Sequence, residues 1–254
     1  MADTLLAMSP AGPESIQTAP AGRPEPTLWL ASRSPRRREL LNEAGVAHAV
    51  IEAAGVDDSE LRPGRASPAS WVAALAWLKA AAGADAVARD QQPVVLAADT
   101  LCVLPGFGMR GLLGQPGDPD EARRTIRRLR GGRHEVLPGV ALYCVRTGVR
   151  DVFVDRAEVS WGAVSDAEID LYVVSGAWRG KAGGYNLRER IDAGWSIEFD
   201  GDPTSIMGLP MRALGPRLAR FGIEATGPGC DGGGTSGGSS GGSSAGRVLR
   251  ADVA

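Results

Sequence analysis

The residues best suited to chemistry begin at LASRSPRRREL, residues 30–40, where four arginines surround the start of an expected helix. A strand that turns directly into a helix presents unpaired backbone N–H groups and the positive end of the helix dipole. Guanidinium groups at that end are repelled by the dipole unless an anion lies between them. Arg33 precedes the helix, and Arg36 shares a face with Leu40. We therefore interpret Arg33, Arg36 and Arg37 as a polyphosphate site rather than as a solvated basic helix face.

Asp99 is the second candidate, a carboxylate inside the apolar run PVVLAADTLCVL, residues 93–104. A carboxylate in a buried strand is costly unless it binds a metal, pairs with a cation or marks a site at the strand end. A capping aspartate at a strand end is the common alternative. Asp57, Asp58 and Glu60, in GVDDSE, could be further metal ligands, although their spacing alone favours a solvated loop.

Only two of the 28 lysines and arginines are lysines, Lys79 and Lys181. A compact ammonium acts as a point charge where a planar guanidinium cannot, so a lysine retained in an arginine-rich chain is a candidate functional residue. For either lysine alone, chance retention is an equally good explanation. Lys181 lies in RGKAGGYN, whose glycines let the backbone approach a ligand but which lacks Walker A spacing. His134, after a Gly-Gly turn, is in a place where histidine is more often structural than catalytic.

The elements that must position these residues alternate between strands and helices. Ser34 and Pro35 predict a helix start, as do Asp118 and Glu121 further along the chain. The helix over 67–88 is expected to bury Trp71, Leu75 and Leu78. We expect strands at 27–32, 47–53, 93–104, 134–146 and 151–161, the last two joined as a hairpin, and helices from 34, 67, 118, 166 and 209. This order predicts an α/β fold with a mixed twisted sheet flanked by helices.

Composition sets limits on the class of protein. The 254 residues are 43% hydrophobic and 23% charged with a formal net charge of -2, a balance without general affinity for nucleic acid or membrane surfaces. No apolar stretch approaches the roughly 18 residues that span a bilayer. Three cysteines at wide spacings favour reduced thiols and a cytoplasmic location. We expect a disordered segment at 1–26, one folded domain at 27–225 and a flexible Gly/Ser-rich tail at 226–254.

Taken in order, LASRSPRRRELL, AADT, G-x-P followed by D-x-x-EA, GGRHEV, KAGGY and GLP resemble the motifs of the Maf family of nucleotide pyrophosphatases, over about residues 27–220. These proteins are also called septum-formation inhibitors. The resemblance implies two lobes around a central cleft, and hydrolysis of a nucleoside triphosphate to monophosphate and pyrophosphate with Mg²⁺ or Mn²⁺. It implies that Asp99 is the general base or metal-anchored carboxylate and that Asp58 is a second metal ligand.

The same resemblance implies a set of residues that bind the triphosphate and its base: Ser32, Arg33, Arg36, Arg37, Lys79, Thr100, Gln115, Lys181 and Arg188. Arg36 and Thr100 match the family's dTTP/UTP branch, and neither this branch nor the 7-methyl-GTP branch matches throughout. Arg188 stands where the dTTP/UTP branch has glutamine, and Gln115 stands where the family usually has lysine. Arg188 either reads the base, or it turns outward or pairs with Glu189 or Asp192, so the base preference stays open.

We therefore expect a cytoplasmic nucleoside triphosphate pyrophosphatase acting on pyrimidine or modified nucleotides. One alternative is an inosine/xanthosine triphosphatase, and another is a nucleotide-binding regulator of cell division without turnover. The expected partners are the nucleotide and, in a homodimer, a second copy of the chain. Nucleic acid and membranes are not expected as partners.

Overall fold

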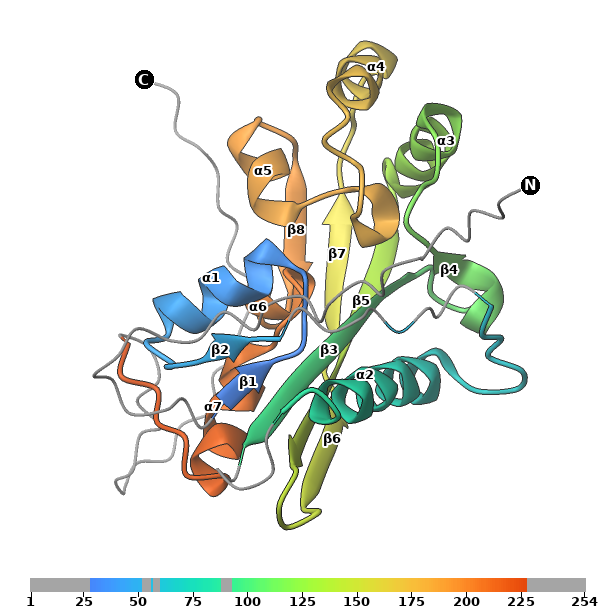
Figure 1. Cartoon of the computed structure of the whole chain (residues 1–254). Coiled ribbons are helices and arrows are strands. Elements are labelled where there is room, and N and C mark those ends of the chain that lie inside the picture. Colours follow the sequence, from blue (N-terminus) through green and yellow to red (C-terminus); the bar gives the residue numbers. More distant parts are fainter. Residues whose placement is uncertain (1–27, 52–55, 57–59, 88–92, 228–254) are drawn as a thin grey trace, which may run out of the picture.

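A computed structural model describes residues 28–51, 56, 60–87 and 93–227 (Figure 1). The candidate metal ligand Asp58, the segment 1–26 and the tail beyond residue 227 lie outside these residues. The strands are β1 Leu28–Leu30, β2 Ala49–Val50, β3 Val94–Val103, β4 Leu112–Leu113, β5 Arg133–Cys144, β6 Arg150–Val154, β7 Ala157–Trp161 and β8 Ile197–Asp200.

Seven α-helices are found within the described ranges. They are α1 Pro35–Glu43, α2 Pro68–Ala84, α3 Pro119–Leu129, α4 Asp166–Ser175, α5 Leu187–Asp192, α6 Pro203–Ile206 and α7 Met211–Arg220, with 3₁₀ turns η2 Gly108–Gly111 and η3 Ala182–Gly184. The expected cap is confirmed at α3, where the Asp118 side chain accepts from Glu121 N at 2.7 Å. None of the described helices is long and apolar enough to cross a membrane.

The strands form one mixed sheet in the order β2-β1-β3-β5-β7-β8, with β4 paired to β3 and β6 paired to β5. The pairs β1–β2 and β1–β3 are parallel, and the remaining pairs are antiparallel. The predicted α/β class with a mixed sheet is confirmed. The long central pair β3–β5 carries the candidate residue Asp99 opposite Gly139.

The prediction of one continuous strand over residues 151–161 is wrong. The chain forms two strands there, β6 and β7, and both pair with β5 at different places. β6 pairs with residues 139–143 of β5, whereas β7 pairs with residues 133–136. Both strands keep the same antiparallel register with β5, and the ladder is interrupted only at Asp155 and Arg156, where Asp155 N still donates to Pro138 O.

The helices cover the sheet in three groups (Figure 1). α2 packs on β3 through small residues such as Ala76 and Ala80, in a cluster with Val95 and Ala97. α1 and α7 pack through leucines against Leu96 and other residues of β1, β3 and β5. α3, α4 and α5 gather around β7 in a separate cluster that includes three buried tryptophans, Trp161, Trp178 and Trp195.

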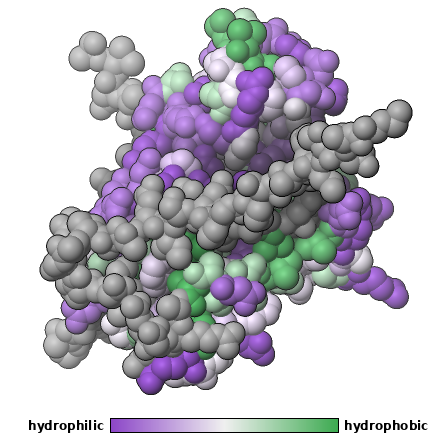
Figure 2. All heavy atoms as spheres, in the orientation of Figure 1, coloured by the Kyte–Doolittle hydropathy of each residue, from purple (hydrophilic) through white to green (hydrophobic). Residues whose placement is uncertain are grey.

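The buried face of α2 differs from the predicted one. Leu75 is buried as expected, but Leu78 is 38% exposed, and Val72 is fully buried. Because α2 lies close to the sheet, its small residues face the strands and the bulkier Leu78 is turned outward. On α4, Leu171 and Val174 are also exposed, and Figure 2 shows hydrophobic surface at the outer end of that helix.

Candidate functional site

The site forms along one edge of β3 that the neighbouring short strands leave open. β1 pairs with residues 94–96 of β3, and β4 pairs with residues 102–103. Between them, residues 97–101 pair only with β5 among the residues that the structure describes. Because side chains alternate along a strand, Asp99 points toward α2 and Thr100 toward α1. Two helices therefore meet at this open edge, each with a different side chain of β3.

Lys79, on α2, forms an ion pair with Asp99. Its Nζ lies 2.6 Å from Asp99 Oδ1, and the two side chains are 25% and 18% exposed. Gly139 makes this approach possible, since a Cβ at that position would lie 2.5 Å from the carbonyl oxygen of Val72 on α2. The structure thus brings together the carboxylate and one of the two lysines that the sequence singled out.

Arg37, on the first turn of α1, donates hydrogen bonds to three oxygens of the protein. Its Nε donates to Gly208 O at 2.9 Å, its Nη1 to Ser32 Oγ at 3.1 Å and its Nη2 to Thr100 Oγ1 at 3.0 Å. Burial lowers the pKa of Arg37 to about 10; the negative charge of Asp99 opposes this shift, and the positive charge of Arg36 adds to it. Asp99 and Arg36 are therefore electrostatic neighbours of Arg37.

These three acceptors, a carbonyl and two hydroxyl oxygens, are neutral, so they satisfy the N–H groups of Arg37 without offsetting its charge. Arg36 differs, because its buried Nε has no hydrogen-bond partner among the described residues. Ser34 occupies the N-cap of α1 as predicted but makes no side-chain capping bond, and Arg33 is exposed. The start of α1 therefore keeps one buried guanidinium N–H without a described partner and one solvent-facing guanidinium for an anion.

The role of the Gly208 carbonyl is not apparent from the sequence. Gly208 has φ +98°, and a Cβ there would lie 3.0 Å from Thr100 Oγ1, so a side chain would disturb the contact between Thr100 and Arg37. Asp202 holds this loop by accepting from Thr204 N at 2.9 Å and from Arg212 N at 3.1 Å. The Gly-Leu-Pro motif is visible in the sequence, but its contact with Arg37, 171 residues away, is not.

The KAGGY segment packs next to β3 and next to the loop that carries Gln115. Gly183 N donates to Gly114 O at 3.0 Å, and a Cβ on Gly183 would lie 3.1 Å from Cys102 Sγ. Lys181 begins this segment, and its Nζ lies 2.5 Å from Glu189 Oε2. Gln115 is exposed beside it. The loops of Lys181 and Gln115 are thus neighbours, as a shared binding role requires.

Arg188 pairs with neither of the acidic partners considered from the sequence. Its Nη1 lies 3.5 Å from Glu43 Oε1, at the last residue of α1, and both side chains are more than half exposed. This pair joins α5 to α1, which lie near each other in Figure 1. Arg188 therefore contacts the last residue of α1, the helix whose first turn carries Arg36 and Arg37.

Comparison with known proteins places these motifs in a family. Residues 27–221 match the family described as Maf-like protein. The chain belongs to the Maf-like protein family. Three relatives bear the name dTTP/UTP pyrophosphatase: one from Anaeromyxobacter dehalogenans is 41% identical over 203 residues, one from Cereibacter sphaeroides is 40% identical over 201 residues, and one from Pelotomaculum thermopropionicum is 37% identical over 197 residues. Each alignment covers 78% of this chain and 95–97% of the relative.

His134 is structural in this Maf-like chain, as its sequence context suggests. The ring is fully buried, its Nε2 lies 2.7 Å from the Tyr185 hydroxyl, and Trp161 packs edge-on against both rings. Burial lowers the pKa of His134 to about 4, so the imidazole is neutral near pH 7. The described hydrogen-bond partner of the His134 side chain is thus Tyr185 of the KAGGY motif, and Tyr185 has no candidate role in the chemistry.

The residues of the Maf-like site fit a divalent cation that arrives with a polyphosphate. Among the described residues, no three His, Cys, Asp or Glu side chains cluster as a complete metal cage. Mg²⁺ at phosphate sites is commonly held by only one or two carboxylates together with substrate oxygens. Asp99 supplies such an oxygen at the open edge of β3, next to the guanidinium of Arg37.

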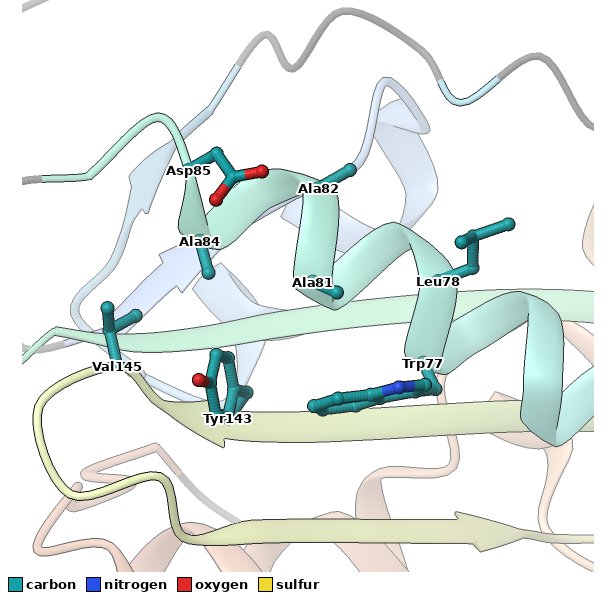
Figure 3. Close-up of a pocket in the computed structure, with 8 residues that line it drawn as sticks. All are labelled: Trp77, Leu78, Ala81, Ala82, Ala84, Asp85, Tyr143 and Val145. Carbon is teal, nitrogen blue, oxygen red and sulfur yellow. The ribbon is translucent and has the colours of Figure 1, made fainter.

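A separate hollow lies away from this site, between the outer side of α2 and the end of β5 (Figure 3). Its lining includes Trp77, Ala81, Tyr143 and Val145, and Trp77 packs edge-on against Tyr143 with ring centroids 5.2 Å apart. None of the candidate site residues that the structure describes lines it. This hollow therefore adds no residue to the candidate site at the edge of β3.

Proposed function

We propose that this protein hydrolyses pyrimidine nucleoside triphosphates, dTTP and UTP among them, to the monophosphate and pyrophosphate. The observation that carries the proposal is the meeting of opposite charges at the open edge of β3, where the Lys79–Asp99 pair lies within electrostatic reach of Arg37. A carboxylate beside several cations suits water activation next to a polyanion. The names of the relatives, which align along nearly their whole length, support the choice of substrate.

The cations bind and orient the triphosphate. Arg36 offers a guanidinium N–H that lacks a partner among the described residues, and α1 adds its positive helix end. Arg37 is fixed by Ser32, Thr100 and Gly208, so its charge is preorganised rather than mobile. Lys79 and Lys181 approach from α2 and from the KAGGY segment. Charge-assisted contacts of this kind are each worth about 1.5–3 kcal/mol.

Asp99 positions the attacking water and accepts its proton on a carboxylate oxygen. Lys79 Nζ lies 2.6 Å from Oδ1, and this contact keeps the carboxylate in one orientation. When bound, Mg²⁺ or Mn²⁺ would neutralise charge on the phosphates, with Asp99 as its described protein ligand and Asp58 as a second proposed one. Breaking the anhydride between the α- and β-phosphorus atoms leaves pyrophosphate held by the surrounding cations.

Thr100 and Arg36 match the dTTP/UTP branch and therefore favour thymine and uracil as the base. Arg188 and Gln115 depart from the expected residues. Arginine only donates hydrogen bonds, whereas a pyrimidine edge such as that of thymine or uracil alternates acceptors and an N–H donor. We therefore propose that Arg188 relaxes the preference for thymine and uracil without abolishing it.

The test is a panel of nucleotides assayed for pyrophosphate release with Mg²⁺ and with Mn²⁺. Release from dTTP and UTP at the highest kcat/KM supports the proposal. A purine-selective profile centred on inosine and xanthosine triphosphates contradicts it in favour of the related triphosphatase. Nucleotide binding without any release, measured by calorimetry, contradicts it in favour of a regulator without turnover.

A cytoplasmic location, the domain bounds 27–225 and assembly as a homodimer remain predictions. Light scattering after size-exclusion chromatography measures the mass of the assembly directly. A monomer mass close to 26.4 kDa at assay concentrations would contradict the homodimer.

A further inference from the structure

An ion pair links Lys181 to Glu189 on α5, and the pyrophosphatase reaction does not by itself require this pair. The Lys181 side chain is only 13% exposed, and its Nζ lies 2.5 Å from Glu189 Oε2. Glu189 is 43% exposed, so one partner is embedded in the protein and the other faces solvent. A mostly buried ammonium is costly without a compensating charge, and Glu189 supplies that charge.

Hydrogen bonds hold the backbone on both sides of the Lys181–Glu189 pair. Asn186 caps α5 by accepting from Glu189 N at 3.3 Å, which places Glu189 on the first turn of the helix. Gly184 N donates to Lys181 O at 2.9 Å, and Tyr172 Oη donates to Gly184 O at 2.8 Å. The pair is therefore preorganised, unlike exposed ion pairs whose long side chains must first be ordered.

Both lysines of the chain form an ion pair with a carboxylate. Lys79 is paired with Asp99, and Lys181 is paired with Glu189, in both cases at or below 2.6 Å. Each ammonium thus has a carboxylate within hydrogen-bond distance. Asp99 has a role in the reaction, but Glu189 belongs to no motif that the sequence singled out.

We propose that Glu189 is a positioning residue that holds Lys181 Nζ in place before binding and yields the ammonium to the triphosphate. This inference rests on the proposed function, because it assigns Lys181 to the phosphates. The exposed carboxylate turns toward solvent as the phosphate oxygens replace it. Glu189 thereby orients the lysine and also opposes the binding of polyanions that cannot displace it.

Replacement of the carboxylate separates these two effects. In Glu189→Gln, the negative charge next to the polyphosphate is gone, so we expect KM to fall about three- to tenfold. The ammonium is no longer held in one orientation, so we expect kcat to fall about tenfold. Lys181→Ala removes the cation itself, and we expect KM to rise about tenfold or more. Glu189→Asp keeps the charge, and its KM should stay within about twofold of the unsubstituted protein.

A matched control comes from another short pair between a glutamate and a cation. Glu135 lies 2.7 Å from Arg156 and is 21% exposed, and it has no part in the proposed site. Glu135→Gln should leave kcat and KM for dTTP within about twofold, as expected of a partly exposed ion pair remote from the chemistry. Melting temperatures of all variants are measured alongside, because a general loss of structure lowers kcat without lowering KM.

The deciding measurement is the double variant Lys181→Ala with Glu189→Gln. If Glu189 acts through Lys181, the second substitution no longer changes kcat in the Lys181→Ala background. An undiminished loss of kcat, again about tenfold, in that background overturns the proposal. So does a Glu189→Gln variant with the kinetics of the Glu135→Gln control, or one in which KM rises as it does in Lys181→Ala.

A second readout remains informative if the proposed function is wrong. Inorganic tripolyphosphate is titrated into the unsubstituted protein and into Glu189→Gln by calorimetry. We expect the variant to bind it about three- to tenfold more tightly, because one repelling charge is removed. Absence of nucleotide hydrolysis together with tighter tripolyphosphate binding would refute the reaction but retain the pairing of Glu189 with an anion site. Equal affinities would overturn the role of Glu189, whatever the reaction.

Discussion

Asp99→Asn is the substitution that tests the site most directly. The amide keeps the shape of the side chain but removes its charge and its capacity to accept a proton from water. Removal of a general base commonly costs about 10²–10⁴-fold in rate. We therefore expect kcat for dTTP to fall at least about 100-fold.

The same substitution leaves Lys79 as a partly buried charge without its carboxylate partner. Breaking a fully buried pair costs about 3–5 kcal/mol. Here the two side chains are 18% and 25% exposed, so solvent screens part of the charge and we expect a loss of about 1–3 kcal/mol in the free energy of unfolding. For a domain of this size that corresponds to a melting temperature lower by about 3–10 °C.

Nucleotide binding should behave differently from turnover. Because the substituted side chain carries no negative charge beside the phosphates, a non-hydrolysable triphosphate analogue should bind as tightly as before or more tightly, as measured by calorimetry. Asp151→Asn is a matched control, since Asp151 is 17% exposed and lies 3.1 Å from Arg220. The control should lose stability but retain activity. Asp99→Asn activity within a few-fold of the unsubstituted protein would remove Asp99 from the mechanism.

Three single contacts lead to further predictions. Thr100→Val removes the acceptor of Arg37 Nη2, so urea unfolding should show a loss of about 1.5–3 kcal/mol together with lower kcat/KM; unchanged stability would mean that this hydrogen bond is not formed in solution. The pKa of His134 is about 4 in the folded protein and about 6.5 in the unfolded chain, so the unfolded chain takes up a proton first as the pH falls. The free energy of unfolding should therefore be about 2 kcal/mol lower at pH 5 than above pH 6.5, and His134→Gln should flatten this pH dependence. Arg188→Gln should shift the kcat/KM ratio toward dTTP and UTP by about tenfold, and an unchanged ratio would mean that Arg188 stays with Glu43 and does not read the base.

The local elements could be predicted because their signals lie within a few residues of one another. Asp118 and Glu121 form the cap of α3 as the spacing predicts, and Pro35 begins α1. The apolar run around Asp99 forms β3, and the second lysine-bearing segment packs next to the site. Such patterns record backbone hydrogen bonding and side-chain periodicity, both of which are short-range.

The break between β6 and β7 and the outward position of Leu78 were not predictable in this way. Residues 151–161 read as one continuous strand, because each half is suitable for a strand on its own. In the structure the two halves keep the same register with β5, and the break between them is local: Asp155 and Arg156 lie opposite Pro138 and Leu137, and a proline has no N–H to donate to the ladder. Likewise, Leu78 fits an apolar helix face by spacing, but the close approach of α2 at Gly139 favours small residues against the sheet.

The order of residues along the chain specifies the set of charged groups: an arginine-rich helix start, a carboxylate in an apolar strand and two lysines retained among many arginines. Which of these charges are already balanced depends on the packing of distant segments. Arg37 is held by oxygens up to 171 residues away and Arg188 by Glu43, whereas Arg36 keeps a buried N–H without a described partner. The physical reason is that the energy of a charge depends on its distance to other charges and on its exposure to water, and both are fixed only when distant segments pack together.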